Sequence, residues 1–97
     1  MVTAILLCNV DRRGIPATAQ ALLDVPEVTE VYSVSGDYDI VAIIRVREHE
    51  HLADVVTGRL AEIDTITHTH TLIAFKAFSQ HDLERLFSIG AEDSMAR

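Results

Sequence analysis

The chain has 97 residues, 48% of them hydrophobic, and its 8 basic and 15 acidic residues give a formal net charge of −7. The length predicts one domain, and so large an apolar fraction in so small a core indicates burial against a second copy. The acidic balance argues against direct binding of nucleic acid, because neutralised phosphates supply much of that affinity. No apolar run approaches the roughly 20 residues of a transmembrane helix and no basic signal-peptide start is present, so the cytoplasm is the expected location.

Hydrophobic spacing and turn residues predict the order of the elements. Short apolar runs rich in β-branched residues indicate strands, and apolar residues three or four apart indicate helices. In chain order we expect a strand at 2–10, a helix opened by 14–16 that stops before 26, strands at 28–35 and 38–46, a helix at 48–63 and a strand at 65–75. Pro16 suits a first helical turn and Pro26 ends that helix, whereas Gly36-Asp37 is a short turn that closes a hairpin.

This order is that of an α+β, ferredoxin-like βαββαβ sandwich, in which two helices pack on one face of a four-stranded antiparallel sheet. The strand at 38–46 is apolar on both faces, so the open face of the sheet must also be covered. We therefore expect a dimer through the sheet. Ser79 with Asp82 three residues later predicts a short C-terminal helix, which divides the chain into a domain at 1–78 and an extension and tail at 79–97.

The turn at 36–39 is the first candidate site. Gly36 can adopt a positive φ and exposes its backbone N–H, which can donate to a carboxylate ligand. Asp37 or Asp39 can pair with an ammonium group. The combination suits a zwitterion such as a free amino acid. The plain alternative is an ordinary Gly-Asp hairpin turn with a solvated carboxylate.

The last strand carries the second candidate. Thr67, Thr69 and Thr71 alternate with His68 and His70, so the two sets point to opposite faces. The threonines could bind a ligand, or they could be ordinary cross-strand pairs. The two histidines could hold a metal, but no third ligand lies at a suitable spacing, and no metal site is expected.

Catalysis has little support in the sequence. It contains no Ser-His-Asp motif, no glycine loop that cradles phosphates and no pair of cysteines, so neither catalytic residues nor cofactors are expected. Cys8 lies in an apolar run and is interpreted as a buried structural thiol. Glu27 and Glu30 flank a strand, and nothing in the sequence gives a reason for their desolvation.

Two stretches together carry a family resemblance. Residues 31–39 hold the G-D-Y-D turn, and residues 67–73 hold T-x-T about thirty residues later. With them, the chain from about 2 to 77 resembles the effector-binding domain of the leucine-responsive/asparagine-responsive (Lrp/AsnC) family of transcriptional regulators. The resemblance implies dimers through the sheets, four of which often form a ring, an octamer. It also implies a free amino acid or similar small effector bound between dimers.

Carried over residue by residue, the resemblance marks a set of ligand-binding positions. These are Gly36, Asp37, Tyr38, Asp39, Thr69 and Thr71, with His70 and Tyr32 as secondary candidates for the pocket wall. Asp39 is expected to meet the ammonium group of the effector, and the region of Gly36 its carboxylate.

The chain departs from the family at its start, because the regulators open with a helix-turn-helix domain and this sequence begins with the first strand. It resembles the stand-alone form, which is expected to act through mixed oligomers with full-length regulators or through another partner. Two alternatives stay open. One is a small dimeric enzyme of the cofactor-free monooxygenase type, which a pocket inside one subunit lined by His68 or His70 would favour. The other is an assembly module without a ligand.

Overall fold

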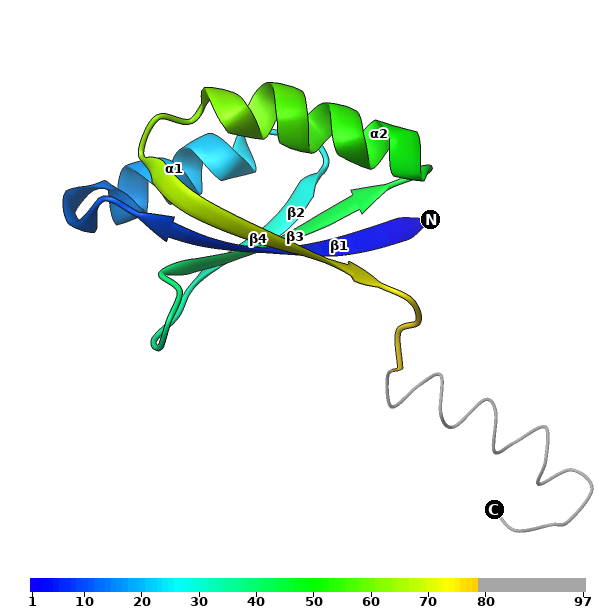
Figure 1. Cartoon of the computed structure of the whole chain (residues 1–97), viewed down its shortest axis with the longest axis horizontal. Coiled ribbons are helices and arrows are strands. Elements are labelled where there is room, and N and C mark those ends of the chain that lie inside the picture. The colour runs from blue at the N-terminus through cyan, green and yellow to red at the C-terminus, as the bar shows by residue number, and fades with distance from the viewer. Residues whose placement is uncertain (79–97) are drawn as a thin grey trace, which may run out of the picture.

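The computed structural model describes residues 1–78, and its elements follow the predicted βαββαβ order (Figure 1). They are β1 (Val2–Val10), η1 (Arg12–Gly14), α1 (Ile15–Leu23), β2 (Val28–Ser33), β3 (Ile40–Val46), α2 (His49–Asp54), η2 (Val55–Arg59), η3 (Leu60–Glu62) and β4 (Ile66–Ala74). The predicted second helix is one continuous helical segment whose middle, η2, is π-helical and whose end, η3, is a 3₁₀ turn. The helix predicted after Ser79 lies outside the described residues.

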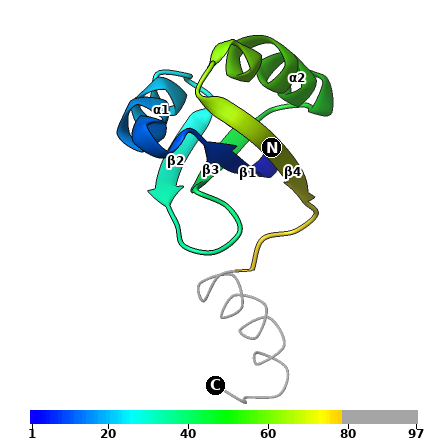
Figure 2. The ribbon, with the colours of Figure 1, turned by 60° about the vertical axis from the view of Figure 1, so that its left-hand side comes forward.

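The sheet has four antiparallel strands in the order β2-β3-β1-β4. Figure 2 shows α1 and α2 on one side of these strands. In the central strand β1, Ala4, Leu6 and Cys8 point towards the helices and are completely buried, whereas the residues between them are only partly buried. The alternation predicted from the sequence therefore places the core between the sheet and the helices.

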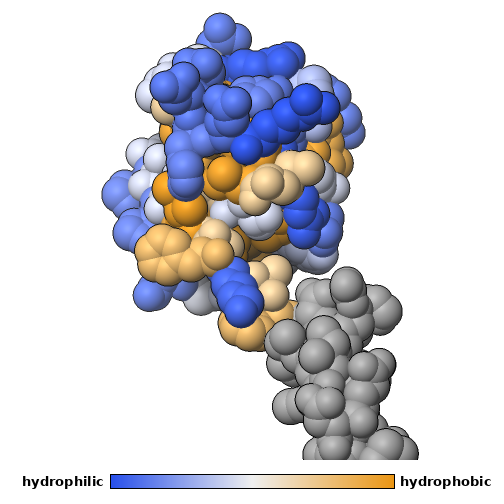
Figure 3. All heavy atoms as spheres, turned by 90° about the vertical axis from the view of Figure 1, so that its right-hand side faces the viewer, coloured by the Kyte–Doolittle hydropathy of each residue, from blue (hydrophilic) through white to orange (hydrophobic). Residues whose placement is uncertain are grey.

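The face of the sheet away from the helices is apolar. We call it the open face, and its apolar centre consists of Ile5, Leu7, Val41, Ile43 and Leu72, which are neighbours across the strands. Leu72 is 43% exposed, and Tyr32 beside Val41 is 51% exposed. Figure 3 shows hydrophobic side chains gathered below the hydrophilic helices. Such a contiguous apolar surface is typical of an interface between proteins.

The connection between β2 and β3 differs from the prediction. The hairpin forms, but β2 ends at Ser33 and β3 begins at Ile40, so residues 34–39 make a loop and the expected tight Gly-Asp turn is wrong. The backbone N–H of Val34 donates to the carbonyl of Asp39 at 3.0 Å, which closes the loop at its base. Figures 1 and 2 show this loop below the sheet, on the side of the open face.

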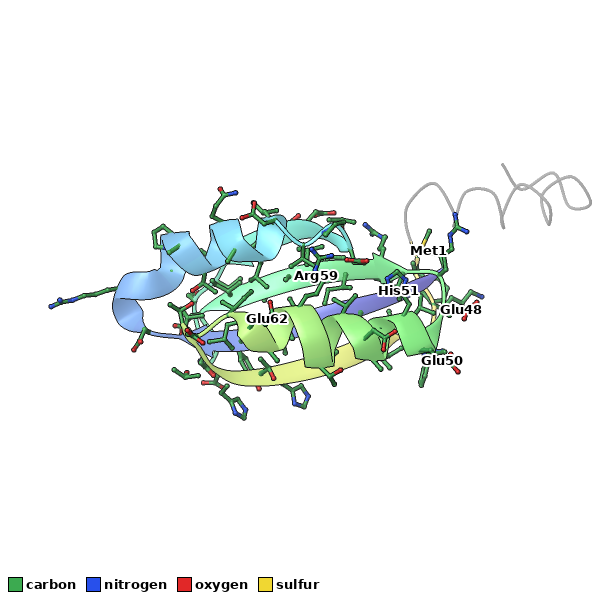
Figure 4. All side chains as sticks on the ribbon, turned by 90° about the horizontal axis from the view of Figure 1, so that it is seen from above. Met1, Glu48, Glu50, His51, Arg59 and Glu62 are labelled. Atoms are coloured by element: carbon green, nitrogen blue, oxygen red, sulfur yellow. The ribbon has the colours of Figure 1, made fainter. Side chains whose placement is uncertain are left out.

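Glu27 corrects a second expectation, because its side chain is partly shielded from water. Its side chain is 17% exposed, and Oε2 lies 2.8 Å from His51 Nε2. Oε1 is buried without a hydrogen-bond partner among the described residues, with Arg59 Nη1 at 3.9 Å. In Figure 4, His51 and Arg59 lie on the side of the α2 segment that faces α1, and Glu50 on the other. Two basic side chains of the helical segment thus hold Glu27, which precedes β2.

This contact predicts a pH dependence of stability. The hydrogen bond from His51 lowers the pKa of Glu27 from its ordinary value near 4.5, and Arg59 adds to the effect. A lowered pKa in the folded state contributes stability above the unfolded pKa, and that stability is lost as the pH falls through the folded pKa. We therefore expect Glu27→Gln to lower the free energy of unfolding at pH 7, with the difference from wild type shrinking below about pH 4.5. Urea denaturation between pH 7 and 3 measures this.

Glu50→Gln is the matched control, because it removes the same charge from the other side of the helical segment. An equal change of pH dependence in both variants would show that net charge, and not the contact of Glu27 with His51, is responsible.

Candidate functional site

The loop at 34–39 presents its glycine to solvent in a conformation that other residues rarely adopt. Gly36 has φ +111°, and no atom lies within 4 Å of the position of a Cβ there. Glycine is therefore required by the backbone angle and not by lack of space. Gly36 and Asp37 are exposed, and Tyr38 and Asp39 are partly buried.

Hydrogen bonds tie this loop to the end of β1. The N–H of Asp39 donates to the carbonyl of Cys8, and the N–H of Val10 donates to Oδ2 of Asp39, both at 3.0 Å. Asn9 Nδ2 donates to the carbonyl of Asp37 at 2.8 Å. Asp39 is thus held by its backbone and by one carboxylate oxygen, Oδ2, and within residues 1–78 no hydrogen bond engages Oδ1.

The thiol of Cys8 lies in the core, on the helix side of the sheet, and is close enough to Asp39 to respond to its charge. Burial, followed by the nearby charge of Asp39, raises the pKa of Cys8 to about 11. The thiol stays protonated near neutral pH and is a poor nucleophile. This agrees with the interpretation of Cys8 as a structural residue.

The threonines of β4 face the helices. Thr69 is the cross-strand partner of Cys8, and Thr71 that of Leu6, so both share the side of the sheet that packs on the core. The exposed Thr69 lines a pocket of about 380 Å³, a size that suits a small ligand. The remaining lining residues come from β1, the helical segment and the start of β4: Leu6, Val56, Leu60, Ala61, Ile63, Ile66, Thr67 and His68.

The two predicted groups do not meet within one subunit. Strand β1 separates β3 from β4, so two strand spacings, about 10 Å, lie between Ile40 and Thr69. The loop lies on the side of the open face, whereas Thr69 and Thr71 are on the helix side. The described lining of the pocket includes Thr69 but no residue of 36–39. In a single subunit the loop and the threonines are therefore separate.

The secondary candidates are placed on the open face. His70 is the partner of Leu7, and Tyr32 that of Val41. The hydroxyl of Tyr32 donates to the carboxylate of Glu30, and this bond raises the pKa of Tyr32. Both side chains therefore share the side of the sheet on which the loop lies, opposite Thr69 and Thr71.

Sequence reasoning missed Asn9, and it named Thr67 as one of three threonines that could bind a ligand but not among the positions implied by the resemblance. Asn9 binds the loop through its side chain, and its carbonyl accepts from Thr67 Oγ1 at 3.2 Å. A polar amide near the end of an apolar strand run is a signal that could have marked Asn9, because it must find a partner when partly buried. Within residues 1–78, no group of three or more His, Cys, Asp or Glu is placed to hold a metal ion. No helix in the same range is long and apolar enough to cross a membrane.

The sequence profile of the Lrp/AsnC ligand binding domain matches residues 3–83. The chain belongs to this family. A curated Lrp/AsnC relative, the HTH-type transcriptional regulator FL11 of Pyrococcus furiosus, is 32% identical over 79 residues, which are 81% of this chain and 52% of the regulator. The chain spans about half the length of the curated relatives it matches.

Solved structures agree with the Lrp/AsnC assignment. TTHA0845 from Thermus thermophilus superimposes with a TM-score of 0.76 at 39% identity, covering 82% of this chain and 100% of that one. AsnC of E. coli superimposes with a TM-score of 0.77 at 26% identity, covering 81% of this chain and 54% of AsnC. The predicted family and the ferredoxin-like fold are confirmed.

Proposed function

We propose that this chain is a non-enzymatic, amino-acid-responsive oligomeric module of the Lrp/AsnC type that modulates transcription through a partner. The observation that carries the proposal is the loop at 34–39. It combines an exposed Gly36 at positive φ with an Asp39 carboxylate of which only Oδ2 is hydrogen-bonded among residues 1–78. Backbone N–H groups suit the carboxylate of an amino acid, and a fixed aspartate suits its ammonium group.

The binding site is proposed at a seam between dimers. A site for a zwitterion also needs groups that hold the rest of the ligand. Thr69 offers a hydroxyl in the pocket, and Thr71 lies two residues further along the same face of β4. Because these threonines and the loop lie apart in one subunit, a loop from one dimer would meet the threonines of the next. Dimers formed through the open face and joined by four such seams, an octamer, would place every loop at a seam.

The partner is proposed to be a full-length regulator of the same family, joined in a mixed oligomer. The curated relatives are transcriptional regulators about twice the length of the matched region. The net charge of −7 makes direct DNA contact by this chain unfavourable. A change of assembly on effector binding would then reach DNA through the partner.

Asp39→Asn tests the amino-acid site. The asparagine oxygen still accepts from the N–H of Val10, so the loop keeps its anchor while the negative charge is lost. We expect calorimetry against the twenty amino acids to detect an effector for the wild type, and the variant to bind it roughly 10- to 100-fold more weakly, as for a charged hydrogen bond.

Asp11→Asn is the control, since it removes the same charge from an exposed position next to β1 but outside the loop. Absence of binding by the wild type at millimolar amino acid, with an unchanged particle size in light scattering, would favour the assembly module without a ligand.

One observation favours a second function, that of a small enzyme. His68 lines the pocket inside one subunit, as a cofactor-free enzyme of this fold would require. However, His68 pairs with Asn9, so alternation places its ring on the face opposite Thr69, and the other described lining residues hold no acid or base. Under the main proposal, His68→Ala leaves the effector bound and the assembly intact. A substrate turned over by the wild type and not by His68→Ala would support the enzyme instead.

A further inference from the structure

The loop at 34–39 and the strand β4 are joined through one residue of β1. Asn9 donates from Nδ2 to the carbonyl of Asp37 at 2.8 Å, and its own carbonyl accepts from Thr67 Oγ1 at 3.2 Å. The next residue, Val10, donates its N–H to Asp39 Oδ2 at 3.0 Å. Consecutive residues of a central strand therefore hold the loop on one side and β4 on the other.

The hydrogen bond from Thr67 to Asn9 lies at an irregularity in the sheet. Asn9 pairs with His68, but Val10 pairs with Ile66, so Thr67 is an extra residue that bulges out of the ladder. Bulges are stabilised by specific contacts and often re-aim the residues next to them. The hydroxyl of Thr67 supplies such a contact by folding back onto Asn9. Two residues further on is Thr69, which lines the pocket together with Thr67.

We propose that Asn9 is a positioning residue that couples the conformation of the loop at 36–39 to the conformation of β4 at 67–69. The coupling itself stands on these contacts, but its consequence for ligand binding rests on the proposed function. If each subunit gives its loop to one seam and its threonines to another, Asn9 lies between two ligand sites. An effector that draws the carbonyl of Asp37 or the carboxylate of Asp39 towards itself strains their bonds to Asn9 and Val10. That strain then shifts Thr67 and Thr69, which belong to the neighbouring site. Binding is therefore cooperative around the assembly.

The test uses two threonines that are alike in structure. Thr67 in β4 and Thr29 in β2 are each the extra residue of a bulge, and each donates its hydroxyl to a backbone carbonyl at 3.2 Å. Thr67 donates to Asn9, whereas Thr29 donates to Ile43 and also accepts from Arg45. Thr67→Val and Thr29→Val therefore each remove a bond from a hydroxyl to a backbone carbonyl at a bulge, the first to Asn9 and the second away from it. Thr29→Val also removes the bond from Arg45, so it is the more disruptive of the two changes.

The first readout is the amide NMR spectrum of the assembled protein without any amino acid. In Thr67→Val we expect the resonances of Gly36 and Asp37 to shift although the change lies in another strand. In Thr29→Val those resonances stay in place. In Asn9→Ala both the loop and residues 67–69 shift, and adding Thr67→Val to Asn9→Ala causes no further shift of the loop. Loop resonances unmoved by Thr67→Val overturn the coupling, whether or not an effector is found.

The second readout is calorimetry with the twenty free amino acids. The wild type is expected to bind its effector with a Hill coefficient different from one, and Thr67→Val with a coefficient near one. Asn9→Ala is expected to weaken binding roughly 2- to 10-fold, as for a neutral hydrogen bond. A wild type that binds with a coefficient of one contradicts the inference but leaves the proposed function standing. Coupled loop shifts without any amino-acid binding contradict the proposed function but still support the coupling of the loop to β4 through Asn9.

Discussion

Replacing Ile43 with aspartate is expected to break the assembly into folded monomers. Ile43 lies at the centre of the open face, where it is the partner of Ile5 on β1 and of Glu30 on β2. Its side chain points away from the helices, so an isolated subunit can keep a carboxylate there in water. A symmetric dimer through this face would instead bury the new charge twice, and the nearby cation on this face, Arg45, already lies 4.0 Å from the carboxylate of Glu30. We expect the dimer to weaken more than roughly 100-fold.

Sedimentation velocity measures the mass, and circular dichroism shows whether the fold is kept. Leu23→Asp is the matched control, because Leu23 is an apolar residue that is 49% exposed on α1, away from the sheet. It introduces the same charge but leaves the open face unchanged. A dimer that survives Ile43→Asp would mean that the subunits associate through another surface.

Leu6→Ala is expected to cause the largest loss of stability. Leu6 lies in the central strand, is completely buried between the sheet and the helices, and also forms part of the pocket that Thr69 lines. Truncation of such a side chain removes apolar contacts and leaves a cavity, which costs about 2–5 kcal/mol. Urea denaturation gives the difference in the free energy of unfolding, and the pocket should become larger at the same time.

Its neighbour provides the comparison. Leu7 follows Leu6 in the same strand but points to the open face, where it is only partly buried. Leu7→Ala should therefore destabilise the isolated subunit less than Leu6→Ala and should instead weaken the dimer. Similar losses in monomer stability for both variants would contradict the assignment of the two faces.

The order of elements was predictable because it depends on local patterns. The alternating apolar residues of β1 and the prolines at 16 and 26 determine the secondary structure only within a few residues of their own positions. The ends of the hairpin were not predictable in this way. The loop is held by Asp39 and Val10, which are 29 positions apart, and no local propensity records such a bond. Glu27 is a similar case, since His51 is 24 positions away.

The candidate site was predictable in its residue types but not in its arrangement. Gly36 and Asp39 lie in the connection where a turn carrying an acidic residue was expected, and Gly36 has a positive φ, which glycine tolerates. The faces of Thr69 and Thr71 followed from alternation, but their separation from the loop follows from the strand order, which depends on long-range pairing. The role of Asn9 was not predictable, because its two partners come from segments far away in the sequence.

The bulges at Thr29 and Thr67 have a further consequence, for aggregation. They occur in β2 and β4, the outer strands of the sheet. A regular outer strand offers an unbroken row of backbone donors and acceptors to any other chain and can seed fibres. A bulge interrupts that row and increases the local twist, so a foreign strand finds no matching partner along the whole edge. Growth of the sheet sideways into an open-ended filament is therefore discouraged. The proposed association through the open face does not use these edges.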